Sequence, residues 1–161
     1  MIINPNFPSG YVVFCDDVRQ EITGKTTQVG IYNGHMILFG STPVVLPQLC
    51  AVITLRFLPP KVSFRPIFKI FQTGREEAIY ELEGEVTPVE ALEENTPLPV
   101  DDGLIRFHSF YVLAQLQGLT ITEACSLKVR AFIGQDEIRL GTLQIIVASP
   151  EEQAEQATAT S

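Results

Sequence analysis

The sequence predicts an all-β protein, and the architecture that fits it best is an antiparallel β-sandwich of immunoglobulin-like or C2-like type. Eight or nine short segments are rich in β-branched and aromatic residues, and most of them alternate apolar with polar side chains. Glycine, proline and asparagine separate these segments, as is typical of turns between strands. The 161 residues contain no internal repeat and no shift of composition, so one domain is expected. The chain has no tryptophan, so the buried tryptophan of true immunoglobulin domains is missing.

Residues 11–40 are expected to form three strands around which the rest of the fold is organised. These strands cover residues 11–15 with a continuation at 18–22, residues 26–32, and residues 35–39. The charged pair Asp16–Asp17 interrupts the first strand, which indicates a bulge or kink. Asn33–Gly34 is typical of a type I′ turn, because both residues tolerate left-handed dihedral angles. The second and third strands are therefore expected to form a hairpin.

Further strands are expected in the rest of the chain, over residues 49–57, 62–73, 78–86, 104–116, 125–133 and 138–147. The first of these follows a proline-containing connection, residues 41–47, and is apolar on both faces near its start, as in a central strand. In residues 125–133 the odd-numbered positions are apolar and are expected to point inward. A turn at residues 134–137 then leads into the last strand.

One short helix is expected inside a long acidic loop, residues 87–103. Residues 87–90, Thr-Pro-Val-Glu, have the pattern of a capping box with proline at the first helical position, and the helix is expected to end near Glu94. The complete organisation is then an N-terminal arm over residues 1–10, a single sandwich domain over residues 11–148 and a flexible tail over residues 149–161.

The charge of the chain limits its partners. There are 19 acidic and 11 basic residues, which give a net charge of −8. This disfavours nucleic acid and anionic membrane surfaces as partners, because both attract basic faces. No apolar run approaches the roughly 20 residues of a membrane-spanning helix, and the N-terminus lacks the features of a secretory signal. A cytoplasmic protein is therefore expected.

The three cysteines, Cys15, Cys50 and Cys125, each lie in or beside an apolar run. Their odd number and the absence of CxxC spacing indicate free thiols that are buried in a reducing cytosol. A metal site would require a fourth ligand and closer spacing. A catalytic dyad of Cys15 or Cys50 with His35 or His108 is an alternative that no local signature supports.

Other catalytic and binding motifs are missing too. His35 stands beside a turn and is expected to be exposed, and His108 is expected in the core or at an interface. There is no GxSxG, HExxH or phosphate-binding glycine loop. We therefore expect no enzyme, and no catalytic, cofactor-binding or metal-binding residue.

Acidic pairs provide one alternative, because a Ca²⁺ site gathers carboxylates from several loops. Three pairs fall at expected strand ends or loops: Asp16–Asp17, Asp101–Asp102 and Asp136–Glu137. Carboxylates also occur at turns and strand edges in most β proteins, and no DxDxDG loop is present. We therefore favour the interpretation that these acidic pairs mark turns and edges and do not bind Ca²⁺.

Residues 14–34, FCDDVRQEITGKTTQVGIYNG, resemble the N-terminal signature of an uncharacterised family of small bacterial and phage proteins. The resemblance is most specific at Cys15–Arg19, Gly24–Lys25 and Gly30–Tyr32, and it weakens after about Cys50. It implies a compact β-rich domain and no established activity.

The leading functional hypothesis is a non-catalytic module that acts through protein–protein contacts and self-associates into a homo-oligomer. A specific form is a phage structural protein of the capsid or tail, located in the virion. The alternative is a regulatory module that binds a small molecule or Ca²⁺. Five phenylalanines either fill the space between two sheets or cover a subunit interface: Phe64, Phe68, Phe71, Phe107 and Phe110.

Overall fold

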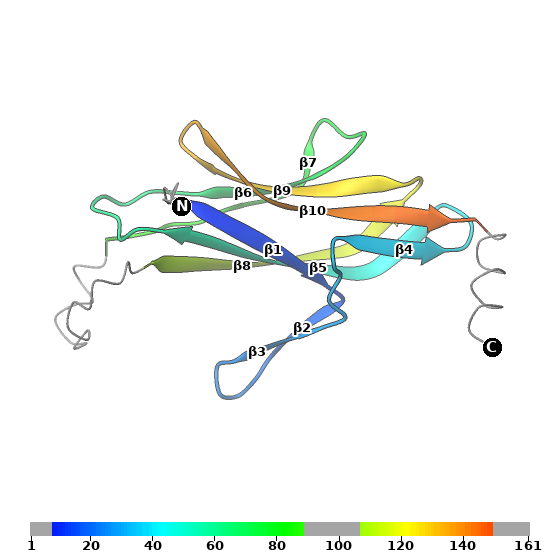
Figure 1. Cartoon of the computed structure of the whole chain (residues 1–161), viewed down its shortest axis with the longest axis horizontal. Coiled ribbons are helices and arrows are strands. Elements are labelled where there is room, and N and C mark those ends of the chain that lie inside the picture. Colours follow the sequence, from blue (N-terminus) through cyan, green and yellow to red (C-terminus); the bar gives the residue numbers. More distant parts are fainter. Residues whose placement is uncertain (1–7, 89–106, 150–161) are drawn as a thin grey trace, which may run out of the picture.

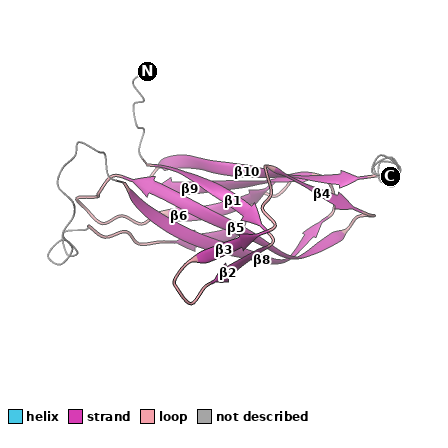
Figure 2. Cartoon of the chain, turned by 60° about the horizontal axis from the view of Figure 1, so that its bottom comes forward, coloured by secondary structure: helices cyan, strands magenta, loops and turns pink. Residues whose placement is uncertain are grey.

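The computed structural model describes residues 8–88 and 107–149, and this part of the chain forms strands and no helix (Figures 1 and 2). The all-β prediction is therefore confirmed. The ten strands are β1 (Ser9–Cys15), β2 (Asp17–Gln20), β3 (Thr26–Val29), β4 (His35–Phe39), β5 (Val44–Phe57), β6 (Ile67–Gln72), β7 (Ala78–Glu83), β8 (His108–Ile121), β9 (Cys125–Ile133) and β10 (Asp136–Ala148).

The strands form two layers and a separate hairpin (Figure 1). One layer is a three-stranded sheet with the order β1-β5-β8, and the other is a five-stranded sheet with the order β4-β10-β9-β6-β7. Strands β2 and β3 pair only with each other, and their hairpin projects from the three-stranded sheet on the side away from the five-stranded one.

The core lies between the two sheets, where alternate side chains of each strand meet. From the three-stranded sheet it receives the odd-numbered residues 49–57 of β5 and the even-numbered residues 112–116 of β8, among them Leu49, Ile53 and Val112. Phe68 and Leu127 enter from the five-stranded sheet, and all five of these side chains are buried. This period of two is what a sheet with one covered face requires.

The parity is reversed before Pro47 in β5 and after Gly118 in β8, and Leu46 and Leu119 are buried there. The strand predicted at residues 49–57 and the inward direction predicted for the odd-numbered residues of 125–133 are confirmed, the latter at Leu127, Val129 and Ala131.

The two sheets approach each other closely at one side of the sandwich. Here β1 packs against β10, and two glycines permit the contact. A Cβ atom on Gly141 would lie 2.6 Å from Cγ1 of Val12, and one on Gly10 would lie 2.6 Å from Cδ2 of Leu140. Such distances are shorter than real Cβ contacts, so larger residues at these positions would force the sheets apart.

The opposite side is formed by β7 and β8, and no backbone pairing connects these two strands. The sandwich is therefore closed at the β1–β10 side and open at the β7–β8 side.

Two predictions about strand pairing are wrong. The sheets are not purely antiparallel, because β4 pairs with β10 in parallel, with His35 opposite Gln144. The hairpin predicted at Asn33–Gly34 does not form either, because β3 pairs with β2 while β4 joins a different sheet. Gly34 instead helps to anchor β4, since its carbonyl accepts a hydrogen bond of 2.9 Å from the backbone N–H of Gln144.

Several predicted strand boundaries also change. Strand β5 begins at Val44, inside the segment expected to be a connection, although it contains Pro47. Proline cannot donate to a ladder, and the pairing of β5 with β8 accordingly passes over Pro47 and Gly118, joining Leu46 to Leu119 and Gln48 to Gln117. Strand β1 begins at Ser9, inside the predicted N-terminal arm.

Some expectations fall on the parts of the chain that the structure leaves out. The predicted helix, apart from its first two residues, lies outside the described residues, as do residues 1–7 of the arm and residues 150–161 of the tail. Within the described ranges, no helix has the length and apolar character needed to cross a membrane.

The packing makes a direct prediction for two neighbouring residues of β5. Ile53 points into the core, whereas Val52 points outward and is partly exposed. Ile53→Ala should lower the free energy of unfolding by roughly 2–5 kcal/mol, because it leaves a cavity in a close-packed core. The matched control Val52→Ala should cost about 1 kcal/mol. Urea denaturation measures both values, and equal losses would contradict the assigned faces.

Candidate interaction surface

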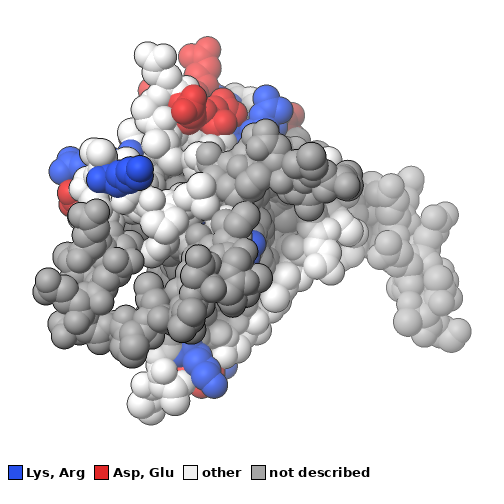
Figure 3. All heavy atoms as spheres, turned by 60° about the vertical axis from the view of Figure 1, so that its left-hand side comes forward, with Lys and Arg blue, Asp and Glu red and all other residues white. Residues whose placement is uncertain are grey.

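The outer face of the five-stranded sheet is charged. Lys69 on β6 and Glu81 on β7 form an ion pair of 2.9 Å, and Arg130 on β9 pairs with Glu137 on β10 at 3.0 Å. Figure 3 shows acidic and basic side chains at the top of the molecule, the side on which Figure 1 places β6, β9 and β10, and further ones at the lower edge. Ion pairs between neighbouring strands are typical of a solvated sheet face. At the β4–β10 end of the same face, three apolar residues are exposed: Ile37, Phe39 and Ile146.

The outer face of the three-stranded sheet differs from it. The face consists of four rows, each with one residue from β1, β5 and β8: Ser9–Arg56–Ser109, Tyr11–Thr54–Tyr111, Val13–Val52–Leu113 and Cys15–Cys50–Gln115. Arg56 carries the one charge in these rows, and its guanidinium carbon lies 5.2 Å from the ring centroid of Tyr11. The two central rows therefore offer mainly apolar and aromatic groups where a solvated sheet would carry polar ones.

In the two central rows, the exposed residues lie on the flanking strands β1 and β8 and not on the central strand β5. Tyr111 is 67% exposed, and Tyr11 and Leu113 are each 41% exposed. Thr54 is 1% exposed even though it points outward, because the two tyrosines stand on either side of it. Directly opposite residues on neighbouring strands are close enough for such side chains to touch.

The β2–β3 hairpin stands at the end of this face, next to the row of Cys15. It carries exposed apolar side chains as well, with Ile22 in its turn and Ile31 just after β3. In Figures 1 and 2 the hairpin extends from the three-stranded sheet, and β2 contacts β5. The hairpin and the sheet therefore present apolar groups on the same side of the molecule.

Asp16 is the residue at which the chain leaves β1 and enters the hairpin. Its backbone N–H donates to the carbonyl of Val29 at 2.9 Å, and its carboxylate accepts a hydrogen bond from the Tyr32 hydroxyl. The backbone N–H of Tyr32 donates in turn to the carbonyl of Phe14 at 2.9 Å. These contacts hold both ends of the hairpin against the end of β1.

Gln48 joins the root of the hairpin to the sheet. Its side-chain amide donates to the backbone carbonyl of Asp16 and to the carboxylate of Asp17, both at 3.2 Å. Asp17 also accepts from the backbone N–H of Val18 at 2.9 Å and pairs with Arg19 at 3.4 Å. Both carboxylates of the first acidic pair therefore have structural partners.

The buried thiols of Cys15 and Cys50 lie opposite each other beneath this root. Burial raises the pKa of Cys15 to about 11, and the nearby Cys50, Asp16 and Asp17 add to the rise. Burial also raises the pKa of Cys50, with a further contribution from Asp17. Both groups are therefore neutral thiols near pH 7, and a neutral thiol is a poor nucleophile.

The structure also tests the predicted burial of the third cysteine and of the two histidines. The three cysteines are free; Cys15 and Cys50 are buried as predicted, whereas Cys125 is half-buried. His35 is exposed, which confirms its prediction. His108 stacks on Phe57 with ring centroids 6.1 Å apart. No hydrogen bond joins a histidine to a cysteine in residues 8–88 and 107–149.

The acidic pairs are not brought together where the structure describes them. Glu137 is engaged by Arg130 and Arg139, and Asp101–Asp102 lies outside the described residues. No group of three or more histidine, cysteine or acidic side chains able to hold a metal ion occurs in the described ranges. The Ca²⁺ alternative stays a prediction that no contact in this part of the chain favours.

The phenylalanines divide between core and surface. Phe68 is fully buried and stacks on Phe110 at 5.8 Å, and Phe64 packs edge-on against Phe57 at 5.2 Å. Phe107, in contrast, is 44% exposed. The sequence prediction did not single out Tyr11, Tyr111 and Leu113, because their neighbours along the strand are apolar too and no alternation marks the outward positions.

No protein-family model matches this chain, and no curated protein resembles it in sequence. The resemblance of residues 14–34 to small bacterial and phage proteins therefore stays a prediction. In the structure these residues form the end of β1, the hairpin and its root.

Gly30 should be essential for the root of the hairpin. It has a φ of +68°, and a Cβ atom there would collide with the Asp16 carboxylate. Gly24 is a matched control, because its φ of +79° is similar and no atom lies within 4 Å of its Cβ position. Both alanine variants bear the cost of left-handed backbone, about 1 kcal/mol. Gly30→Ala should cost about 1–3 kcal/mol more, by overpacking. Urea denaturation of the two variants provides the comparison, and equal stabilities would show that the root does not constrain the hairpin.

Alkaline pH should weaken the fold through Cys15. Its pKa in the folded protein, about 11, exceeds the ordinary value of 9.0. The stabilisation that this pKa difference provides is therefore complete below pH 9. It is lost as the pH rises from 9 to about 11, because the thiol of the unfolded chain ionises at a lower pH than the thiol of the folded protein. Thermal unfolding of wild type and Cys15→Ala across this window measures the effect. The melting temperature of the variant should fall less steeply, and parallel curves would contradict the burial of this thiol.

Proposed function

We propose that this protein is a non-catalytic β-sandwich module, of immunoglobulin-like or C2-like type, that acts through protein–protein contacts. The contact surface is the outer face of the three-stranded sheet. The observation that carries the proposal is the composition of this face: its two central rows hold tyrosine, valine and leucine and no charged side chain. Ion pairs link neighbouring strands of the five-stranded sheet, and the exposed apolar residues of its outer face, Ile37, Phe39 and Ile146, lie at the β4–β10 end.

The side chains of this face are of the kind that protein interfaces favour. Tyrosine and arginine are enriched among residues that dominate binding energies, and charged residues are depleted from interface centres. Arg56 lies over the ring of Tyr11, so its guanidinium is held beside the aromatic row. Tyrosine has few rotatable bonds and offers a large contact area at a small entropic cost.

The hairpin extends this surface. Ile22, in the turn of the hairpin, is fully exposed, and Ile31, just after β3, is 53% exposed. Exposed apolar side chains of this size gain free energy when a partner removes them from water, at roughly 25 cal/mol per Å². The contacts of Asp16, Gln48 and Tyr32 hold the hairpin in place, so a partner would meet a surface that is already formed.

A more specific form of the proposal is a structural component of a phage particle, attached to the capsid or tail. It rests on the resemblance of residues 14–34, which supply the hairpin and its root. In that case the protein would be found in the virion; otherwise we propose a cytoplasmic location, with no nucleic-acid or membrane partner. Purified particles from the source should then contain the protein.

Site-specific photo-crosslinking tests the surface. A photo-reactive phenylalanine analogue is placed at Tyr11, on the outer face of the three-stranded sheet, and in a control protein at Lys128, exposed on β9 of the five-stranded sheet. The protein is irradiated in the cells or particles that naturally contain it. Position 11 should give discrete protein adducts several-fold more abundant than position 128, because interface centres exclude water and hold a partner in contact. Adducts of equal abundance at both positions, or none at position 11, would reject the proposed surface.

A further inference from the structure

The two sheets have four edge strands, and three of them carry features that prevent pairing with another chain. Strand β1 packs against β10, with close approaches at Gly10 and Gly141. Strand β4 has five residues, which is short. Strand β7 has six residues, and its Glu81 and Glu83 form ion pairs with Lys69 and Arg65. Short edges, charged side chains and coverage by a neighbour are the usual means of blocking edge-to-edge association.

Strand β8 is the exception. It has fourteen residues, HSFYVLAQLQGLTI, and contains no aspartate, glutamate, lysine, arginine or proline. Among the described strands it pairs with β5 alone, so every second residue directs its backbone N–H and C=O away from the sheet. A long, uncharged edge with free backbone groups is a site for strand addition.

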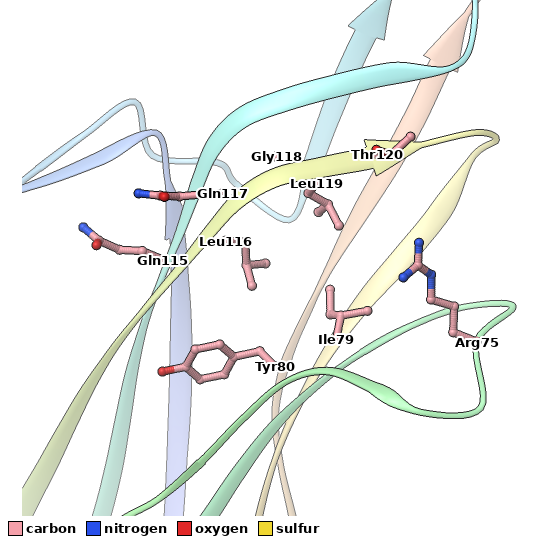
Figure 4. A pocket seen from close by; sticks show the side chains of 9 residues that line it. All are labelled: Arg75, Ile79, Tyr80, Gln115, Leu116, Gln117, Gly118, Leu119 and Thr120. Carbon is pink, nitrogen blue, oxygen red and sulfur yellow. The ribbon is translucent and has the colours of Figure 1, made fainter.

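The side of β8 that faces the interior opens onto a groove of about 390 Å³ between β8 and β7 (Figure 4). Leu116 and Leu119 of β8 are directed toward Ile79 and Tyr80 of β7, whereas Gln115 and Gln117 point away from the groove. Arg75 is the one charged residue of this groove's lining. The open side of the sandwich therefore exposes part of the space between the sheets beside an unpaired edge.

We propose that β8 pairs antiparallel with β8 of a second copy of this chain, with the two-fold axis near Gln115. The two three-stranded sheets then become one six-stranded sheet. This inference rests on the proposed function, since it names a second copy as a partner of the same sheet.

A second copy fits this edge for reasons of charge and symmetry. Each chain has a net charge of −8, so two copies repel each other across most of their surfaces. Strand β8 has no formal charge, and it can approach itself without bringing carboxylates together. A two-fold arrangement needs one self-complementary surface, and an uncharged antiparallel strand satisfies that requirement.

The same arrangement accounts for the exposed residues beside the edge. Two outer faces joined through β8 place Tyr111 and Leu113 of both copies on one continuous surface. The two β7–β8 grooves meet beneath the joined strands, so Leu116 and Ile79 of each copy become less accessible to water. Backbone hydrogen bonds supply the affinity, and the apolar residues of alternate positions determine the register.

A charge-swap experiment tests the proposal. In antiparallel pairing about an axis near Gln115, the two Gln115 side chains lie directly opposite or diagonal to each other. Gln115→Lys and Gln115→Glu should each weaken the dimer roughly tenfold or more, because like charges then meet. Mixing the two variants should restore a dimer. Size-exclusion chromatography with light scattering over a concentration series, with circular dichroism to verify folding, measures the result.

The controls separate the edge from the rest of the surface. Gln144 is exposed on β10, and Gln144→Lys and Gln144→Glu should leave the mass of the wild-type dimer unchanged. If either Gln115 variant fails to fold, the concentration dependence of backbone hydrogen exchange over residues 109–117 of the wild-type protein replaces the charge swap, and exchange that does not slow with concentration overturns the proposal. If the wild type is a dimer and the Gln115 variants dimerise equally well, the proposed location of the contact is wrong. A strictly monomeric wild type would overturn the dimer, while crosslinks at position 11 would still decide the proposed function.

Discussion

The fold depends on burying one apolar face of β5 against the five-stranded sheet. Strand β5 is the centre of its sheet, and its inward side chains Leu49, Ala51 and Ile53 are fully buried. Because a side chain can point to only one side of a sheet, this packing leaves the even-numbered residues 50–56 of β5 on the outer face. Most antiparallel sheets carry polar groups there. Here Val52 and its cross-strand neighbours Val13 and Leu113 occupy those positions, and this departure suggested an interaction surface.

The conspicuous run near the N-terminus has a structural explanation. Asp16, Gly30 and Tyr32 join the end of β1 to the hairpin, and Gln48 ties that junction to β5. Burial keeps the adjacent thiol of Cys15 neutral by raising its pKa to about 11. Residues that looked like candidates for nucleophilic or metal chemistry therefore have neighbours that hold the backbone in place. The same contacts determine where the hairpin stands beside the sheet.

Local patterns predicted single strands well and pairing poorly. The bounds of β4 and β9 and the inward residues of β9 agree with the sequence prediction, because alternation is a property of each strand. Asn33–Gly34 suggested a hairpin, yet the partner of β4 is β10, more than 100 residues further along the chain, which no turn preference can reveal. Pro47 suggested a break, but its missing N–H falls where the β5–β8 ladder skips a pair. The exposure of Tyr111 and Leu113 could not be predicted either, because β8 is apolar at both inward and outward positions here and the sequence alone does not distinguish the two.

The account is tested most directly by hydrogen exchange of the β8 backbone at different protein concentrations. The strand has a free edge in the single chain, so its outward N–H groups should exchange quickly in dilute solution. If this edge meets a second copy, a peptide covering residues 109–117 should exchange more slowly as the concentration rises, while a peptide covering β9, which is paired on both sides, should not change. Fast exchange of residues 109–117 that is independent of concentration would contradict the account.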